Sequence, residues 1–170
     1  MRDGIDVVLL DEHGGPGGRL TSLAHGDPTA RRAQYRMADD PTSARELARA
    51  FVDGKIANMR VALLRADRRG PGASRADLAG TLAAARLLLA DVTSIEEIMG
   101  YEGTATREYF RSWQDDFGTD WGFTARERRP PPDPVNAMLS FGYTLLVHEA
   151  VAALGTAGLD PVPLENRILV

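Results

Sequence analysis

Glu102 is the residue of this sequence best placed to do chemistry. It shares one face of a predicted helix with Ala105 and Tyr109, because residues three and four apart lie on the same side of a helix. A carboxylate beside apolar neighbours needs a cation, a hydrogen-bond donor or a proton. A magnesium site draws on one or two carboxylates together with waters and substrate phosphates, so Glu102 by itself does not make one. The pattern leaves two interpretations open, a metal ligand or a surface glutamate.

The other potential nucleophiles and metal ligands form no recognisable site. The three histidines, His13, His25 and His148, do not cluster in the sequence, and a single histidine on an apolar helix is more often a hydrogen-bonded packing residue. The absence of cysteine excludes a disulfide framework, a thiol nucleophile and a thiolate zinc site. No nucleophile-elbow pattern positions a serine. Asp115 and Asp116 lie at a predicted helix end and are expected to face solvent.

The charge of the chain is unevenly distributed. Its 170 residues support one domain, or one domain and part of a second, and the formal net charge is −4. Nineteen of the 20 basic residues are arginine, and residues 28–69 carry a net charge of +5, from 10 bases and 5 acids. This asymmetry favours an anionic partner, and arginine suits bidentate contacts with phosphate. A GC-rich genome, which favours arginine codons, is the alternative explanation.

The sequence predicts a cytoplasmic protein without a membrane partner. No run approaches the roughly 18 apolar residues that a membrane span needs. The first residues are acidic and interrupted by Gly4, which is not the pattern of a secretory signal peptide.

The hydrophobic pattern predicts a hairpin followed by helices. Strands are expected at 5–11 and 19–23, and the glycine-rich stretch between them is interpreted as a turn, because neither a lysine nor a helix follows it directly as in a phosphate loop. Helical spacing of apolar residues predicts helices from Asp27-Pro28 onward and over 41–69, 74–90, 94–116 and 134–157. The last helix is apolar on nearly all sides, which is typical of a helix in the centre of a core.

Local signals support these helices. Asp40-Pro41 and Asp133-Pro134 each place a capping side chain before a proline, and Ser94 with Glu97 matches a capping box. Over 41–69 the polar face carries arginines and Lys55, and the apolar face consists of Leu47, Ala48, Phe51, Ile56, Met59, Leu63 and Leu64.

Two stretches carry a resemblance to a known family. Residues 101–110 read YEGTATREYF, and residues 123–143 read FTARERRPPPDPVNAMLSFGY. They resemble the segments E-G-x-A-x-x-x-Y-[FW] and F-x-x-R-x-R-R-P-P-x-D-P-V-N-A-x-L-S-[FW]-G-Y of the universal CRISPR-associated spacer-acquisition nuclease, the integrase of CRISPR adaptation. The resemblance runs from residue 4 to about 161 and includes shorter segments in the same order, at 4–10, 32–35 and 54–58.

The resemblance implies a metal-dependent DNA endonuclease. Members of this family insert fragments of foreign DNA into the CRISPR array by attack of a 3′-hydroxyl on a phosphodiester of the repeat, and they also cleave branched DNA. The implied partners are therefore DNA, namely the CRISPR repeat and the incoming spacer, a second copy in a homodimer, and a second small adaptation protein. The implied fold has an N-terminal β-domain and a C-terminal helical domain.

By this resemblance Glu102 is catalytic and is a ligand of Mg²⁺ or Mn²⁺. A hard oxygen ligand there would hold the ion on the scissile phosphate, where it offsets developing charge. The resemblance also makes Arg126, Arg128 and Arg129 candidates for binding DNA phosphates and Asn136 a candidate brace of their loop. The alternative is that these side chains bond to the carbonyls around the triple proline.

The sequence also departs from the family. The family's histidine ligand follows the step Gly158-Leu159-Asp160-Pro161 by a few residues and its aspartate lies further on, but no histidine follows position 148 here. Most of the β-domain should precede Gly4. We therefore expect a hairpin remnant of the N-terminal β-domain at 1–26 and a C-terminally incomplete helical catalytic domain at 27–170.

These observations predict a mainly α fold, a helical bundle preceded by a β-hairpin. The predicted function is that of a CRISPR adaptation integrase and endonuclease, with this chain incomplete for catalysis. The alternative is a non-catalytic DNA-binding or dimerisation remnant of that enzyme, with residues 28–69 as its basic face.

Overall fold

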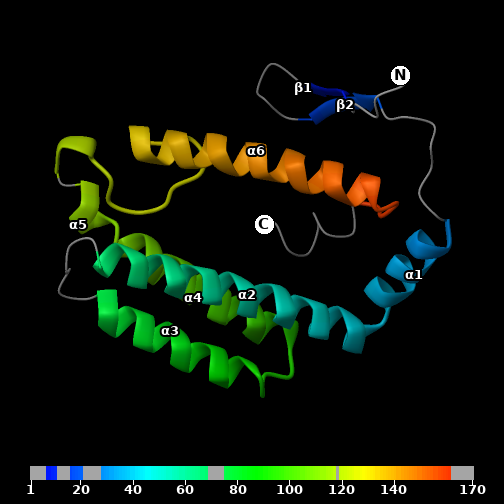
Figure 1. Ribbon diagram of the computed structural model, residues 1–170, viewed down its shortest axis with the longest axis horizontal. Helices are drawn as coiled ribbons and strands as arrows, with labels where there is room; N and C mark the ends of the chain where they lie inside the picture. The colour runs from blue at the N-terminus through cyan, green and yellow to red at the C-terminus, as the bar shows by residue number, and fades with distance from the viewer. Residues whose placement is uncertain (1–6, 11–15, 21–27, 69–74, 118, 162–170) are drawn as a thin grey trace. The chain divides into compact units, whose positions relative to one another are not determined.

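The computed structural model is mainly helical, as the sequence predicts (Figure 1). It describes residues 7–10, 16–20, 28–68, 75–117 and 119–161. The longer elements are the helices α1 (Pro28–Asp39), α2 (Pro41–Asp67), α3 (Arg75–Leu89), α4 (Ile95–Arg111) and α6 (Pro134–Thr156). The shorter ones are the strands β1 (Val7–Leu10) and β2 (Pro16–Leu20), the helix α5 (Gln114–Phe117) and a 3-10 turn (Thr119–Trp121).

The two strands form an antiparallel pair. Val7 lies opposite Leu20 and Leu9 opposite Gly18, with an irregularity in register between Leu9 and Leu10. The second strand begins at Pro16, inside the glycine-rich stretch 13–18 that was predicted to be the turn, so this part of the prediction was wrong. Residues 13–15 of that stretch lie outside the described residues. The interpretation of this pair as the remainder of a larger β-domain stays a prediction.

The chain divides into two compact units, which we describe separately. One unit comprises residues 39–144, and the other comprises residues 1–38 with 145–170. The domain boundary predicted between residues 26 and 27 lies outside the described residues and stays a prediction.

The core of the unit 39–144 is formed by α2, α3 and α4, which lie side by side (Figure 1). Its most deeply buried side chains are Ile56, Leu82, Leu89 and Ile98. The apolar face predicted for α2 is only partly correct. Ala48, Ile56, Met59 and Leu63 are buried and Leu64 packs against the core, but Leu47 and Phe51 are exposed and Val52 is buried in their place.

The predicted capping residues begin two of these helices. The Asp40 carboxylate accepts a hydrogen bond of 2.8 Å from the backbone N–H of Ser43, and Pro41 follows as the first residue of α2. The Ser94 hydroxyl accepts a bond of 3.2 Å from the N–H of Glu97 at the start of α4. Such bonds satisfy helix N–H groups that have no partner within the helix. The helix predicted over 94–116 is broken, since α4 ends at Arg111 and α5 follows.

The prediction that the last helix lies in the centre of a core was wrong. Only Val135 and Asn136 of α6 are buried, and large apolar side chains along it are exposed, among them Met138 at 72% and Phe141 at 67%. The described residues cover its first turn with aromatic side chains and leave the following apolar positions open. A helix that is apolar all round can bury its whole surface only if neighbours surround it.

Helix α6 also corrects the prediction that no segment approaches a membrane span. Over its 23 residues it contains an 18-residue window of mean hydropathy 1.4, which is long and apolar enough to cross a membrane. This criterion concerns length and composition only, and core helices of soluble proteins meet it as well.

Candidate active site on α4 and the loop before α6

Glu102 lies in the middle of α4, at the edge of the core. The neighbouring positions on this helix face differ in burial, because Ala105 is buried and Tyr109 is half-buried. The Glu102 side chain itself is 18% exposed. The carboxylate is therefore largely withdrawn from water, which makes its counter-charge important.

That counter-charge comes from α2. The Lys55 ammonium donates a hydrogen bond to Glu102 Oε1 and forms an ion pair with it. Thr106, one turn further along α4, donates its hydroxyl to the same oxygen at 2.9 Å. The sequence pattern placed Lys55 on the polar face of its helix and did not reveal this pairing. The one signal available was compositional, since Lys55 is the only lysine of the chain.

The described residues do not by themselves fit a divalent metal ion. Within the described parts of the chain, no group of three or more histidine, cysteine, aspartate or glutamate side chains could hold one. Glu102 offers one carboxylate, and its Oε1 already accepts hydrogen bonds from Lys55 and Thr106. Protein sites for Mg²⁺ combine one or two carboxylates with waters and substrate phosphates, so further ligands would have to complete a site at Glu102.

Asn136 is the centre of the loop that precedes α6. It is fully buried, and its Oδ1 accepts hydrogen bonds from Arg126 Nη1 at 3.0 Å and from the Glu127 N–H at 2.9 Å. Its Nδ2 donates to the carbonyl of Ala125 at 2.8 Å and to Asp133 Oδ2 at 2.6 Å. The bracing role that the sequence suggested for Asn136 agrees with these contacts, which fix both ends of the loop.

Arg126 uses its donors within the protein. Besides Asn136, its guanidinium donates to the Glu127 carbonyl at 2.6 Å and to Ser140 Oγ at 3.1 Å, and it lies 5.6 Å from the ring centre of Tyr143. Burial lowers the pKa of Arg126 from its ordinary value, and the nearby charge of Arg128 acts in the same direction. Only the contact with the Glu127 carbonyl is of the kind that the alternative interpretation predicts, and the role of Arg126 in DNA binding stays a prediction.

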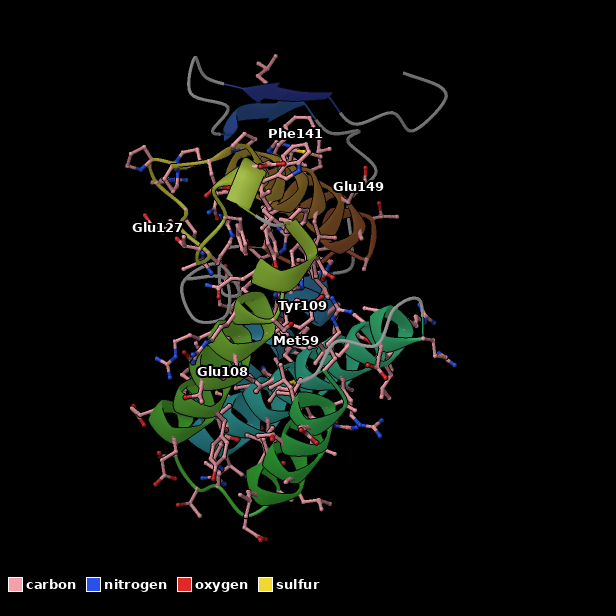
Figure 2. The ribbon with its side chains drawn as sticks, turned by 90° about the vertical axis from the view of Figure 1, so that its left-hand side faces the viewer. Met59, Glu108, Tyr109, Glu127, Phe141 and Glu149 are labelled. Carbon is pink, nitrogen blue, oxygen red and sulfur yellow. The ribbon has the colours of Figure 1, made fainter. Side chains whose placement is uncertain are left out.

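Arg128 and Arg129 differ from Arg126 in their exposure. Both are exposed on the loop, together with Glu127, which projects from it in Figure 2. Exposed guanidinium groups on a braced loop are free to bind an anion from solution. Of the three arginines on this loop, Arg126 is thus bonded within the protein, whereas Arg128 and Arg129 face solvent.

An aromatic cluster joins α4 to this loop. Phe110, Trp113 and Phe123 pack with Tyr109, whose ring meets that of Trp113 edge to face at 5.5 Å between centroids. Burial raises the pKa of the Tyr109 phenol above its ordinary value. Figure 2 shows Tyr109 on the part of α4 nearest the loop. The cluster thus holds the Glu102 helix and the arginine loop within one packed unit.

Next to this cluster lies a cavity of about 210 Å³ between the C-terminal parts of α2 and α4. Its wall includes Arg75, whose side chain is 9% exposed and forms an ion pair with Asp116. The expectation that Asp116 simply faces solvent was incomplete, because one of its oxygens accepts from this buried guanidinium.

With this geometry established, comparisons with known proteins identify the family. The family model described as CRISPR associated protein Cas1 matches residues 1–162. The chain belongs to the Cas1 family. It is 41% identical over 165 residues to the CRISPR-associated endonuclease Cas1 1 of Chlorobaculum tepidum, covering 93% of this chain and 48% of that protein. It is 37% identical over 174 residues to a CRISPR-associated exonuclease Cas4/endonuclease Cas1 fusion of Geobacter sulfurreducens, covering 95% of this chain and 30% of that protein.

Solved structures of Cas1 proteins and related enzymes share the fold. A casposase bound to integration product is 25% identical, with a TM-score of 0.77, covering 94% of this chain and 44% of that one. A Cas1 protein from Thermotoga maritima is 22% identical, with a TM-score of 0.73 over 92% of this chain and 48% of that one. A Cas6-RT-Cas1–Cas2 complex contains a chain 30% identical, with a TM-score of 0.73, covering 94% of this chain and 18% of that one.

The helical fold of this chain is therefore that of Cas1 proteins, and its family is one of nucleases. The chain spans about half the length of curated Cas1 relatives such as the Chlorobaculum tepidum protein.

Proposed function

We propose that this chain is the helical part of a CRISPR adaptation integrase and DNA endonuclease, which inserts foreign DNA fragments as new spacers into the CRISPR array. The proposal is carried by the Cas1 match over residues 1–162. Within this range the partly buried Glu102 lies on α4, the helix that the aromatic cluster joins to the arginine loop. The relatives' names as CRISPR-associated endonucleases support the same activity.

Mg²⁺ or Mn²⁺ is the proposed cofactor, and Glu102 is its proposed ligand and the catalytic residue. Because no group of three or more ligating side chains is found among the described residues, this chain alone is proposed to be incomplete for catalysis. Ligands from outside the described residues would have to complete the coordination of the ion.

DNA is the proposed substrate, in the form of a CRISPR repeat and an incoming spacer. Arg128 and Arg129 are the proposed phosphate contacts on the loop. In the other unit, Arg31, Arg32 and Arg36 of α1 are also exposed and are further candidates for contact with DNA. A neighbour in fold is bound to an integration product, which supports contact with DNA. Binding through such contacts should weaken as salt rises, because each neutralised phosphate releases counterions.

The proposed protein partners are a second copy of the chain and a Cas2 protein. Complexes described as Cas6-RT-Cas1–Cas2 are among the structural neighbours, which supports the second of these. The proposed location is the cytoplasm, where CRISPR DNA lies.

One alternative has an observation in its favour. Since the described residues contain no group of three or more histidine, cysteine, aspartate or glutamate side chains that could hold a metal ion, the alternative is that the chain serves as a non-catalytic DNA-binding or dimerisation module.

Cleavage of branched DNA by the full chain with Mn²⁺ tests the two functions. Glu102→Gln should abolish any cleavage, whereas Glu108→Gln, a matched change on the same helix, should leave it intact. Cleavage that survives Glu102→Gln would contradict the proposed site. Cleavage that Glu102→Gln abolishes would support Glu102 as the catalytic residue and would contradict the proposed incompleteness of this chain. DNA binding without cleavage, weakened by salt, is the result expected both for an incomplete enzyme and for the alternative.

A further inference from the structure

The cavity between the C-terminal parts of α2 and α4 has no part in the proposed function. Its volume is about 210 Å³, and the described residues of its wall all belong to the unit 39–144. A cavity of roughly 150 Å³ is large enough to hold a benzene ring. This cavity therefore has room for a flat molecule of two fused rings.

One part of the wall suits the face of a planar ring. Trp113 lies on it with Phe117 at 5.8 Å and Tyr109 at 5.5 Å between ring centroids. Ala62 and Ala66 of α2 also line the cavity, and their short side chains leave its volume open. Aromatic rings favour stacked or edge-to-face contact with another ring. This part of the wall thus favours an aromatic ligand.

The same wall carries two opposite charges. Arg75 and Asp116 both line the cavity and form an ion pair. The Arg75 side chain is 9% exposed and that of Asp116 is 42% exposed, so water and small solutes reach the carboxylate. A guanidinium carries five N–H donors, and a carboxylate accepts through both of its oxygens. A pure hydrocarbon in this cavity would withdraw these charges from water and offer them no hydrogen bond, which is costly.

We propose that this cavity binds a guanine-type base, a planar two-ring heterocycle whose edge carries a carbonyl oxygen next to two N–H donors. Asp116 accepts from the N–H donors, Arg75 donates to the carbonyl oxygen, and the rings lie against the aromatic wall. Arginine commonly donates to the carbonyl oxygen of guanine in DNA, and acidic side chains accept from the amino groups of bases. Adenine has no carbonyl on this edge, so it matches the ion pair less completely.

The base has two chemical sources, a free nucleoside or a nucleotide of a DNA strand. The second source rests on the proposed function, in which DNA is the substrate. The first is independent of it, because a free nucleoside needs neither the DNA surface nor a metal ion.

Fluorescence of Trp113 in the full chain tests the proposal. The chain has two tryptophans, so Trp121→Phe leaves Trp113 as the only one. Guanosine should quench this emission saturably. In N1-methylguanosine a methyl group replaces one N–H donor, and its affinity should be at least about tenfold lower, because a hydrogen bond to a charged group is lost. Equal affinity of the two nucleosides overturns the proposal.

Two variants of α2 locate the binding site. Ala62→Phe fills the cavity and should lower the affinity at least about tenfold, whereas Val61→Phe, at an exposed neighbouring position, should leave it unchanged. Where Ala62→Phe does not fold, Ala66→Leu fills the same cavity with a smaller side chain. Quenching that is as strong in the filled variants as in the parent overturns the proposal.

Two single-stranded oligonucleotides, one of thymine alone and one with a central guanine, separate the sources. Quenching by guanosine supports the free nucleoside, and quenching by the guanine oligonucleotide alone supports a base presented by DNA. Quenching by neither guanosine nor the guanine oligonucleotide overturns the proposal, and so does equal quenching by both oligonucleotides without quenching by guanosine. These measurements involve no cleavage, so their failure is distinct from a failure of the cleavage experiment.

Discussion

The side-chain amide of Gln34 forms two hydrogen bonds with the backbone of Asp160, one as donor and one as acceptor, as paired strands of a β-sheet do. Gln34 Nε2 donates to the Asp160 carbonyl at 2.6 Å, and the Asp160 N–H donates to Gln34 Oε1 at 2.8 Å. Tyr35 adds a bond of 2.7 Å from its hydroxyl to Asp160 Oδ2. Two adjacent residues of α1 thus hold the segment that follows α6, inside the unit made of residues 1–38 and 145–170.

Gln34→Ala should loosen this segment. The change removes the two hydrogen bonds that the Gln34 side chain makes with the Asp160 N–H and carbonyl, which costs roughly 1–3 kcal/mol for part-buried groups. Hydrogen exchange of the Asp160 amide should become faster, and Arg36→Ala, an exposed position on the same helix, should leave it unchanged. Exchange as slow as in the unchanged chain would show that the pairing does not hold the segment.

The phenol of Tyr35 should lose its proton at a higher pH than an ordinary tyrosine does. Its hydrogen bond to the Asp160 carboxylate raises the pKa of the phenol above its ordinary value. A raised pKa in the folded state means that the contact stabilises below the ordinary tyrosine value of about 10 and is lost as pH rises through the raised value. In a pH titration followed by tyrosinate absorbance, Tyr35→Phe should lose one of the components that ionise above the ordinary tyrosine pKa. The Asp160→Asn variant, which keeps an acceptor without charge, should retain a smaller shift.

Asn136→Ala should destabilise the arginine loop strongly. It removes the acceptor of Arg126 and of the Glu127 N–H, and it leaves the Ala125 carbonyl without its donor. Several buried groups without partners cost roughly 2–4 kcal/mol together, measurable by denaturant unfolding.

Ser140→Ala provides the matched control for this loop, because it removes two bonds at the edge of the same network, one of 3.1 Å from Arg126 and a long one of 3.5 Å to the Arg128 carbonyl. Its cost should be about 1 kcal/mol. If both variants were equally stable, the buried amide of Asn136 would not be the centre of the loop's stability.

Replacing Arg75 and replacing Asp116 should destabilise the protein by different amounts, although the two residues form one ion pair. Asp116→Asn removes one negatively charged partner of the Arg75 guanidinium, whose side chain is 9% exposed, and should cost about 1–3 kcal/mol. Arg75→Met leaves only the more exposed Asp116 unpaired and fills the same space with an apolar side chain, so its cost should be smaller. Denaturant unfolding of both variants measures the difference, and the reverse order would contradict the assigned burial.

The sequence alone predicts the helices of this protein because local rules determine them. Asp40, Ser94 and the prolines mark helix starts through bonds that span three residues, and the apolar spacing of α2 and α4 reflects the helical repeat. The motif around Glu102 was likewise visible, because its resemblance lies in consecutive residues. Asn136 as a brace was open to prediction for the same reason.

The tertiary structure alone decided which distant side chains meet. Lys55 lies 47 residues from Glu102, and Gln34 lies 126 residues from Asp160, so no local pattern links either pair. It also decided that Leu47, Phe51 and most of α6 are exposed, because burial depends on the neighbours that surround a helix and not on its own apolar face. Helical repeats and caps act within one turn, whereas counter-charges, braces and burial depend on packing between elements.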